Sequence, residues 1–111
     1  MDQDAIRALR RNLGDALLAK LLRRSAGSVR SYANGRRTVP PLIARRLEWV
    51  RHVTLSLAGG YNAMGMRAWF GRPRVQLGQR SPLASLGPDW TPSDASVAHV
   101  EKLAATLRGP G

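Results

Sequence analysis

Residues 17–37 read LLAKLLRRSAGSVRSYANGRR, a run that predicts two short helices joined by a tight turn. Small and apolar residues recur where the inner faces of such a pair would meet, namely at Leu18, Ala19, Leu22, Val29 and Tyr32. Ala19 is small enough for the point at which the helices cross. The turn falls at Arg23-Arg24, and the Ser25 hydroxyl can accept a hydrogen bond from the free backbone amides that open the second helix.

The second of these helices is predicted over residues 26–34, with a polar outer face. Gly35 follows it, and glycine readily adopts the left-handed conformation that closes helices. The outward residues are small or form hydrogen bonds, namely Ala26, Gly27, Arg30, Ser31 and Asn34. Such side chains suit entry into the major groove of DNA, so we predict a helix-turn-helix. The alternative is one hairpin of a small helical bundle with no role in nucleic-acid binding.

The predicted DNA contacts extend from the turn to the basic tail that follows the second helix. Arg30 is expected to read a base, because its guanidinium can pair with both acceptors of a guanine. Arg23, Arg36 and Arg37 are expected to bind phosphates without regard to sequence. The full predicted set is Arg23, Arg24, Ser25, Gly27, Ser28, Arg30, Ser31, Asn34, Arg36 and Arg37.

Positive charge is concentrated in the same half of the chain. The 111 residues carry a formal net charge of +11, and +8 of it lies in residues 1–58. All but two of the 18 basic residues are arginine, which suits forked contacts to phosphate and guanine. A field of this kind is expected of a DNA-binding protein. Taken alone, it would equally suit an anionic membrane surface.

The composition argues against several other functions. The chain has no cysteine, so disulfides and thiolate metal sites are excluded. Its two histidines are isolated and its seven acids dispersed, so we expect no enzyme, no metal site and no cofactor. No apolar run approaches the length of a membrane span, and Asp2-Gln3-Asp4 does not begin a signal peptide. We therefore expect a cytoplasmic bacterial protein without membrane association, located at the nucleoid when bound to its operator.

Helices are also predicted on either side of the helix-turn-helix. Residues 4–13 place apolar side chains at helical spacing between arginines, with Gly14 ending the helix and Asp15 placed to cap the next one. Pro40-Pro41 prevents continuation of the preceding segment and suits a fresh start, so a long helix is predicted over residues 41–58. This helix is apolar over much of its circumference and is expected to bridge two parts of the protein.

A boundary is predicted at Gly59-Gly60, and three shorter helices are predicted beyond it. The first is capped by Asn62 and runs to Phe70, and the second occupies residues 81–86. The third starts near Thr91, with Asp94 spaced to complete a capping box, and ends near Gly109-Pro110. The predicted fold class is therefore all-α, with a DNA-binding domain and its bridging helix at residues 1–58 and a small helical domain at residues 59–111.

The motif in residues 17–37 resembles the helix-turn-helix of the Xre-type (Cro/repressor-like) DNA-binding proteins, and the resemblance covers roughly the first half of the chain. That family usually has a glycine followed by an apolar residue at the turn, where this chain has Arg23 and Arg24. Either the turn has a different shape, or one arginine points outward toward phosphate. One recognition helix covers only a few base pairs, so a homodimer on a double-stranded DNA operator is expected.

The run GMRAWFGRPRVQLGQRSPLASLG resembles the toxin-binding domain of Xre/ParS-type antitoxins, over roughly residues 61–107. The shared features are Trp69 on a helix, Pro73, Leu77-Gly78 and Ser81-Pro82-Leu83, whereas Gln79 replaces a second glycine that is common there. The resemblance implies the antitoxin of a type II RES/Xre toxin–antitoxin pair, which neutralises a RES-domain toxin and regulates its own operon. The alternative is a stand-alone or phage-type repressor that uses this half only to dimerise.

Aromatic residues often anchor protein interfaces, and two of the three tryptophans follow Gly60. The residues predicted to bind a partner are Trp69, Trp90, Val97, Val100 and Leu107. Trp69 is expected to be internal, and Trp90 is the candidate for an exposed anchor. The alternative is that Trp90 folds back over Trp69 and closes a small core.

Overall fold

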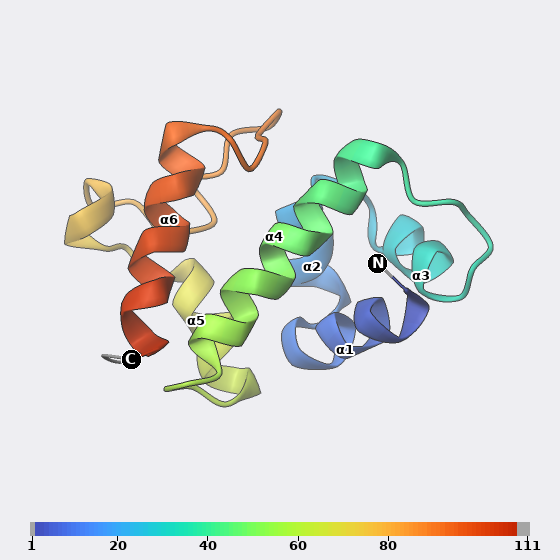
Figure 1. Cartoon of the computed structure of the whole chain (residues 1–111), viewed down its shortest axis with the longest axis horizontal. Coiled ribbons are helices and arrows are strands. Elements are labelled where there is room, and N and C mark those ends of the chain that lie inside the picture. Colours follow the sequence, from blue (N-terminus) through green and yellow to red (C-terminus); the bar gives the residue numbers. More distant parts are fainter. Residues whose placement is uncertain (1, 109–111) are drawn as a thin grey trace.

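The computed structural model describes residues 2–108, and within this range the protein consists of helices, turns and loops without a β-strand (Figure 1). The helices are α1 (Gln3–Leu13), α2 (Asp15–Leu22), α3 (Ala26–Ala33), α4 (Pro41–Leu57), α5 (Ala63–Gly71) and α6 (Ala95–Ala105), with short 3-10 helices η1 (Val75–Leu77) and η2 (Thr106–Arg108). The predicted all-α fold class is confirmed.

The helix pair α2–α3 follows the sequence pattern closely. All five residues predicted for its inner faces are buried, including Ala19. The Ser25 hydroxyl accepts a hydrogen bond from the Ser28 amide at 3.0 Å, as predicted for the cap of α3. Gly35 has a φ angle of 78°, the left-handed conformation that ends the helix without steric cost.

The turn between α2 and α3 contains a left-handed residue that is not glycine. Arg23 has a φ angle of 58° and a ψ angle of 43°, and its amide donates to the Lys20 carbonyl. L-residues pay a steric cost in this region, which glycine avoids. The turn between α2 and α3 is therefore left-handed at Arg23, a position occupied by an L-residue with a side chain.

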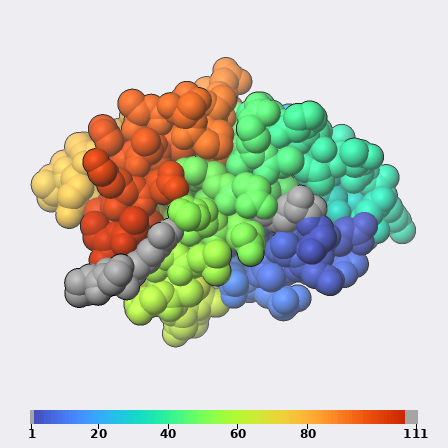
Figure 2. Space-filling model, viewed as in Figure 1, coloured from blue at the N-terminus to red at the C-terminus, as the bar shows by residue number. Residues whose placement is uncertain are grey.

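Helix α4 lies between the two ends of the molecule and contacts α2 on one side and α6 and η2 on the other. Figure 2 shows residues of α4, in green, reaching the surface between the blue amino-terminal helices and the red α6. Helix α5 packs on α1, so the segments predicted as separate domains on either side of Gly59 touch directly. Their buried apolar residues belong to one continuous core.

Two predicted elements of the second half differ in the structure. Residues 81–86 form consecutive turns rather than a helix, although the Ser81 hydroxyl does accept from the Ala84 amide at 3.0 Å. Gly87-Pro88 follows directly and prevents these turns from continuing as a helix. Helix α6 begins at Ala95, after a turn in which the Asp94 carboxylate accepts from the Thr91 amide at 3.0 Å. The predicted end near Gly109-Pro110 lies outside the described residues.

Candidate nucleic-acid interface

Helix α3 exposes the side chain on which the DNA-binding prediction chiefly depends. The Arg30 side chain is 57% exposed, and Asn34, at the carboxyl end of the helix, is also exposed. Ser31 and Gly27 are half-buried. The outer face of α3 therefore offers a long cationic donor with smaller groups around it, which is a surface able to approach base edges.

The amino-terminal end of α3 carries a connected set of polar groups. The Ser25 hydroxyl caps the helix and also donates to the Ser28 hydroxyl at 3.1 Å. The Ser28 hydroxyl accepts from Arg37 Nη1 at 2.8 Å, and the Arg37 guanidinium lies 5.6 Å from the centre of the Tyr32 ring. The basic tail after α3 thus folds back, so that a cation stands near the helix amides, where anions bind readily.

The segment just after α3 is held by a local hydrogen bond. The Asn34 side-chain oxygen accepts from the Arg36 amide at 3.0 Å, which fixes the tight turn through Gly35. Arg36 is exposed, and so is Arg24 at the other end of the helix. Arg24 donates to the Arg23 carbonyl at 3.1 Å and remains on the surface.

Arg23, which is predicted to contact a phosphate, also makes a hydrogen bond within the protein. Its Nη2 donates to the Leu86 carbonyl in the carboxy-terminal half, and the bond is partly buried. The guanidinium is therefore engaged in joining the turn of the helix-turn-helix to the loop after residue 86. Arg23 is nevertheless an exposed residue, and its role as a phosphate contact stays a prediction.

Asp15 has a different role from the helix cap that the sequence suggests. Gly14 occupies the cap position of α2, and Asp15 is the first helical residue. The Asp15 carboxylate accepts two hydrogen bonds from Arg10, at 2.7 and 3.1 Å, and its Oδ2 lies 3.9 Å from Arg30 Nη1. The hydrogen bond from Arg10 lowers the pKa of Asp15 and raises the pKa of Arg10. An ionised carboxylate is thus fixed beside the candidate base-reading residue.

Arg46, one of the basic residues of the first half, is buried and has a structural role. It is 2% exposed and donates to the Leu22 carbonyl and the Trp90 carbonyl, each at 2.9 Å. Its burial lowers its pKa. The sequence does indicate a buried position for Arg46, because it lies one helical turn from both Ile43 and Val50 on the apolar stripe of α4.

The predicted partner-binding residues are core residues. Trp69, Trp90, Val97 and Val100 are buried, and Leu107 is half-buried against the same core. The prediction of Trp90 as an exposed anchor is wrong. Its indole nitrogen donates to the Leu21 carbonyl at 2.8 Å, and its ring meets the Trp49 ring edge-on at 5.0 Å. Trp90 does close the core, but its ring partner is Trp49 of α4 where Trp69 was expected.

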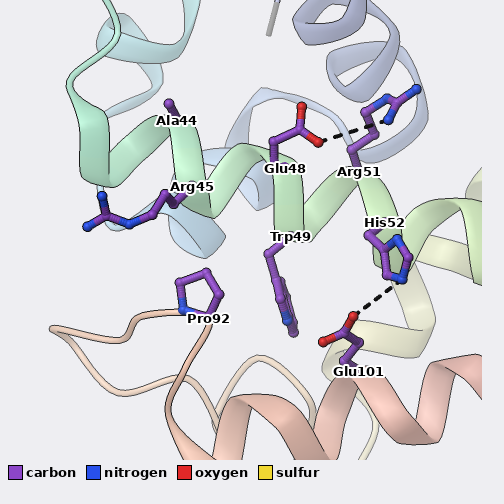
Figure 3. A pocket seen from close by; sticks show the side chains of 8 residues that line it. All are labelled: Ala44, Arg45, Glu48, Trp49, Arg51, His52, Pro92 and Glu101. Carbon is purple, nitrogen blue, oxygen red and sulfur yellow. Dashed lines mark ion pairs between the residues drawn. The ribbon is translucent and has the colours of Figure 1, made fainter.

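A shallow groove lies between α4 and the segment that leads into α6 (Figure 3). Among the side chains that line it, Arg51 lies 4.0 Å from Glu48, and His52 Nε2 lies 3.3 Å from Glu101 Oε1. Across residues 2–108, no three side chains of His, Cys, Asp or Glu gather in a way that could hold a metal ion. Within the same range, no helix has the length and apolar character required to cross a membrane.

Comparison with known proteins gives no guide to the family of this chain. No family model matches the sequence, and neither a curated protein nor a solved structure matches it.

Proposed function

We propose that this protein binds double-stranded DNA sequence-specifically by placing α3 in the major groove. The observation that carries the proposal is an α2–α3 pair whose second helix exposes Arg30 between surface arginines at both of its ends. A helix is narrow enough for the major groove, and an exposed arginine on it can donate to both acceptors of a guanine. Cations at the ends of the helix suit the two phosphate backbones that border the groove.

The surrounding arginines divide between these roles by position. Arg24 precedes α3 and Arg36 follows it, and both are exposed and suited to phosphate. Arg37, held over the amino-terminal end of α3 by Ser28, adds a cation where the helix amides already favour an anion. These contacts orient the helix, while Arg30 supplies the preference for sequence.

A dimer belongs to the same proposal. One recognition helix contacts too few base pairs to select one site in a genome, so two copies are expected to bind half-sites about one helical turn apart on an inverted repeat. A cytoplasmic location, at the nucleoid when operator is bound, follows from this function.

Arg36→Ala is expected to weaken binding to all duplexes by a similar factor. The loss of one phosphate contact should reduce the slope of log K against log salt concentration by about one unit. The measurement is fluorescence anisotropy with one preferred and one random duplex at several salt concentrations. Arg72→Ala is the matched control, since Arg72 is exposed and directly follows α5. In Figure 1, α5 lies well away from α3.

The same salt slope for Arg36→Ala and the parent protein would remove Arg36 from the interface. Equal losses for Arg36→Ala and Arg72→Ala would contradict the placement of DNA on α3, because they would indicate attraction by overall charge alone.

A narrower form of the proposal is that the protein is the antitoxin of a RES/Xre pair. Its support is the sequence resemblance over residues 61–107, since four of the five residues predicted to bind a partner are buried and Leu107 is half-buried. The alternative is a stand-alone or phage-type repressor. Co-expression with the protein encoded in the neighbouring reading frame separates the two: rescue of growth from a toxic neighbour supports the antitoxin, and a harmless neighbour supports the repressor.

A further inference from the structure

Three charged side chains from three helices meet at one edge of the candidate interface. Asp15 opens α2, and its carboxylate is fixed by the two hydrogen bonds from Arg10 on α1. Arg30 of α3 approaches the same carboxylate, with Nη1 at 3.9 Å from Oδ2. This distance is too long for a hydrogen bond. The N–H groups of Arg30 are therefore not committed to Asp15, although the negative charge still acts on them.

A fixed carboxylate at this distance affects how Arg30 can bind DNA. A free arginine side chain carries about 2 kcal/mol of rotamer entropy, part of which is lost when it pairs with a base. A nearby anion restricts the guanidinium before binding and so reduces that loss. The same anion repels phosphate, whereas the guanine edge presents uncharged acceptors. Both effects favour a base over the backbone as the partner of Arg30.

We propose that Asp15 is a specificity-determining residue, which positions Arg30 toward a base edge and away from the phosphates. Arg10 acts in turn on Asp15, because its forked hydrogen bonds hold the carboxylate in place. This inference rests on the proposed function, since it needs Arg30 at a base pair. A role in folding alone would be different. In that case Asp15 would only join α1 to α2 and stabilise the amino-terminal end of α2.

The test measures base preference in Asp15→Asn, with the full chain and duplexes that vary one base pair at a time. The base pair read by Arg30 is first identified as the one whose preference disappears in Arg30→Ala. At that pair, Asp15→Asn is expected to lower the preference by about tenfold, within the range that one forked contact supplies. Affinity for random duplexes is expected to rise about two- to fivefold at low salt, because one repulsive charge has been removed.

Two variants control for charge and for stability. Asp4→Asn removes the same charge from an exposed residue paired with Arg7 on α1, and should leave every base preference unchanged. Arg10→Gln leaves both Asp15 and Arg30 in the chain but frees the carboxylate, so the same base preference should fall by a smaller factor. Thermal unfolding of each variant shows that it is folded at the temperature of the binding assay.

The outcomes separate the two proposals. Loss of preference confined to the base pair read by Arg30 supports the role of Asp15. An unchanged preference in Asp15→Asn overturns that role and leaves DNA binding by α3 intact. A parent protein that shows no preference among duplexes overturns both.

Discussion

Arg46→Ala is expected to lower the free energy of unfolding by about 3 to 5 kcal/mol. The substitution leaves the Leu22 and Trp90 carbonyls without their donor in a buried site, at a cost of roughly 1 to 3 kcal/mol each. It also removes the packing of the arginine on the Trp90 ring, whose centre lies 5.2 Å from the guanidinium carbon. Domains of this size are stable by only about 5 to 15 kcal/mol, so the loss is a large fraction.

Urea denaturation followed by circular dichroism measures this effect, and the adjacent arginine is its control. Arg45 is exposed, and Arg45→Ala should change the free energy of unfolding by no more than about 0.5 kcal/mol. Equal stabilities for the two variants would show that Arg46 does not join α2 to the loop at Trp90.

Trp90→Ala is expected to destabilise the protein by about 3 to 5 kcal/mol, as large-to-small substitutions of buried tryptophan do. Trp90 is 1% exposed, contacts the Trp49 ring and donates to the Leu21 carbonyl. Trp90→Phe keeps most of the ring volume and removes the donor, so a loss of about 1 to 3 kcal/mol is expected. Denaturation curves of the two variants separate packing from hydrogen bonding.

A change of less than about 1 kcal/mol in Trp90→Ala would contradict a core position for this residue, since exposed side chains rarely cost more. Because both substitutions remove the packing of Arg46 on the Trp90 ring, the double variant should lose less stability than the two single losses combined.

The local part of this fold could be predicted from the sequence. Helix starts at Ser25 and Asn62 depend on one side chain and an amide three residues later, and both caps form as expected. The inner residues of α2 and α3 follow from helical period alone. The short segment after Ser81 was harder, because a cap followed by proline starts a turn or a helix equally well, and the outcome depends on Gly87-Pro88.

The contacts between distant segments could not be predicted in this way. Trp90 and Leu21 are far apart in sequence, as are Arg23 and Leu86, and each pair meets only because the loop after residue 86 returns to the end of α2. A pattern that marks Trp90 as apolar does not say which surface covers it. The pairing of Asp15 with Arg10 could not be predicted either, because it depends on how α1 and α2 pack.

The exposure of Arg30 and Asn34 was predictable from the helical period of α3, whereas Gly27 and Ser31 are half-buried and Ala26 packs partly against the core. Arg46, one of the twelve basic residues of the first half, lies in the core and donates to two backbone carbonyls. Net charge alone therefore overstates the number of cations available to DNA.

Selection from a randomised duplex library tests the claim that α3 reads DNA through Arg30. The parent protein is expected to enrich an inverted repeat whose half-sites lie about one helical turn apart and contain a fixed guanine. Arg30→Ala should enrich the same repeat with that position no longer fixed. Enrichment of an identical sequence by Arg30→Ala, or of no sequence by the parent protein, would contradict the claim.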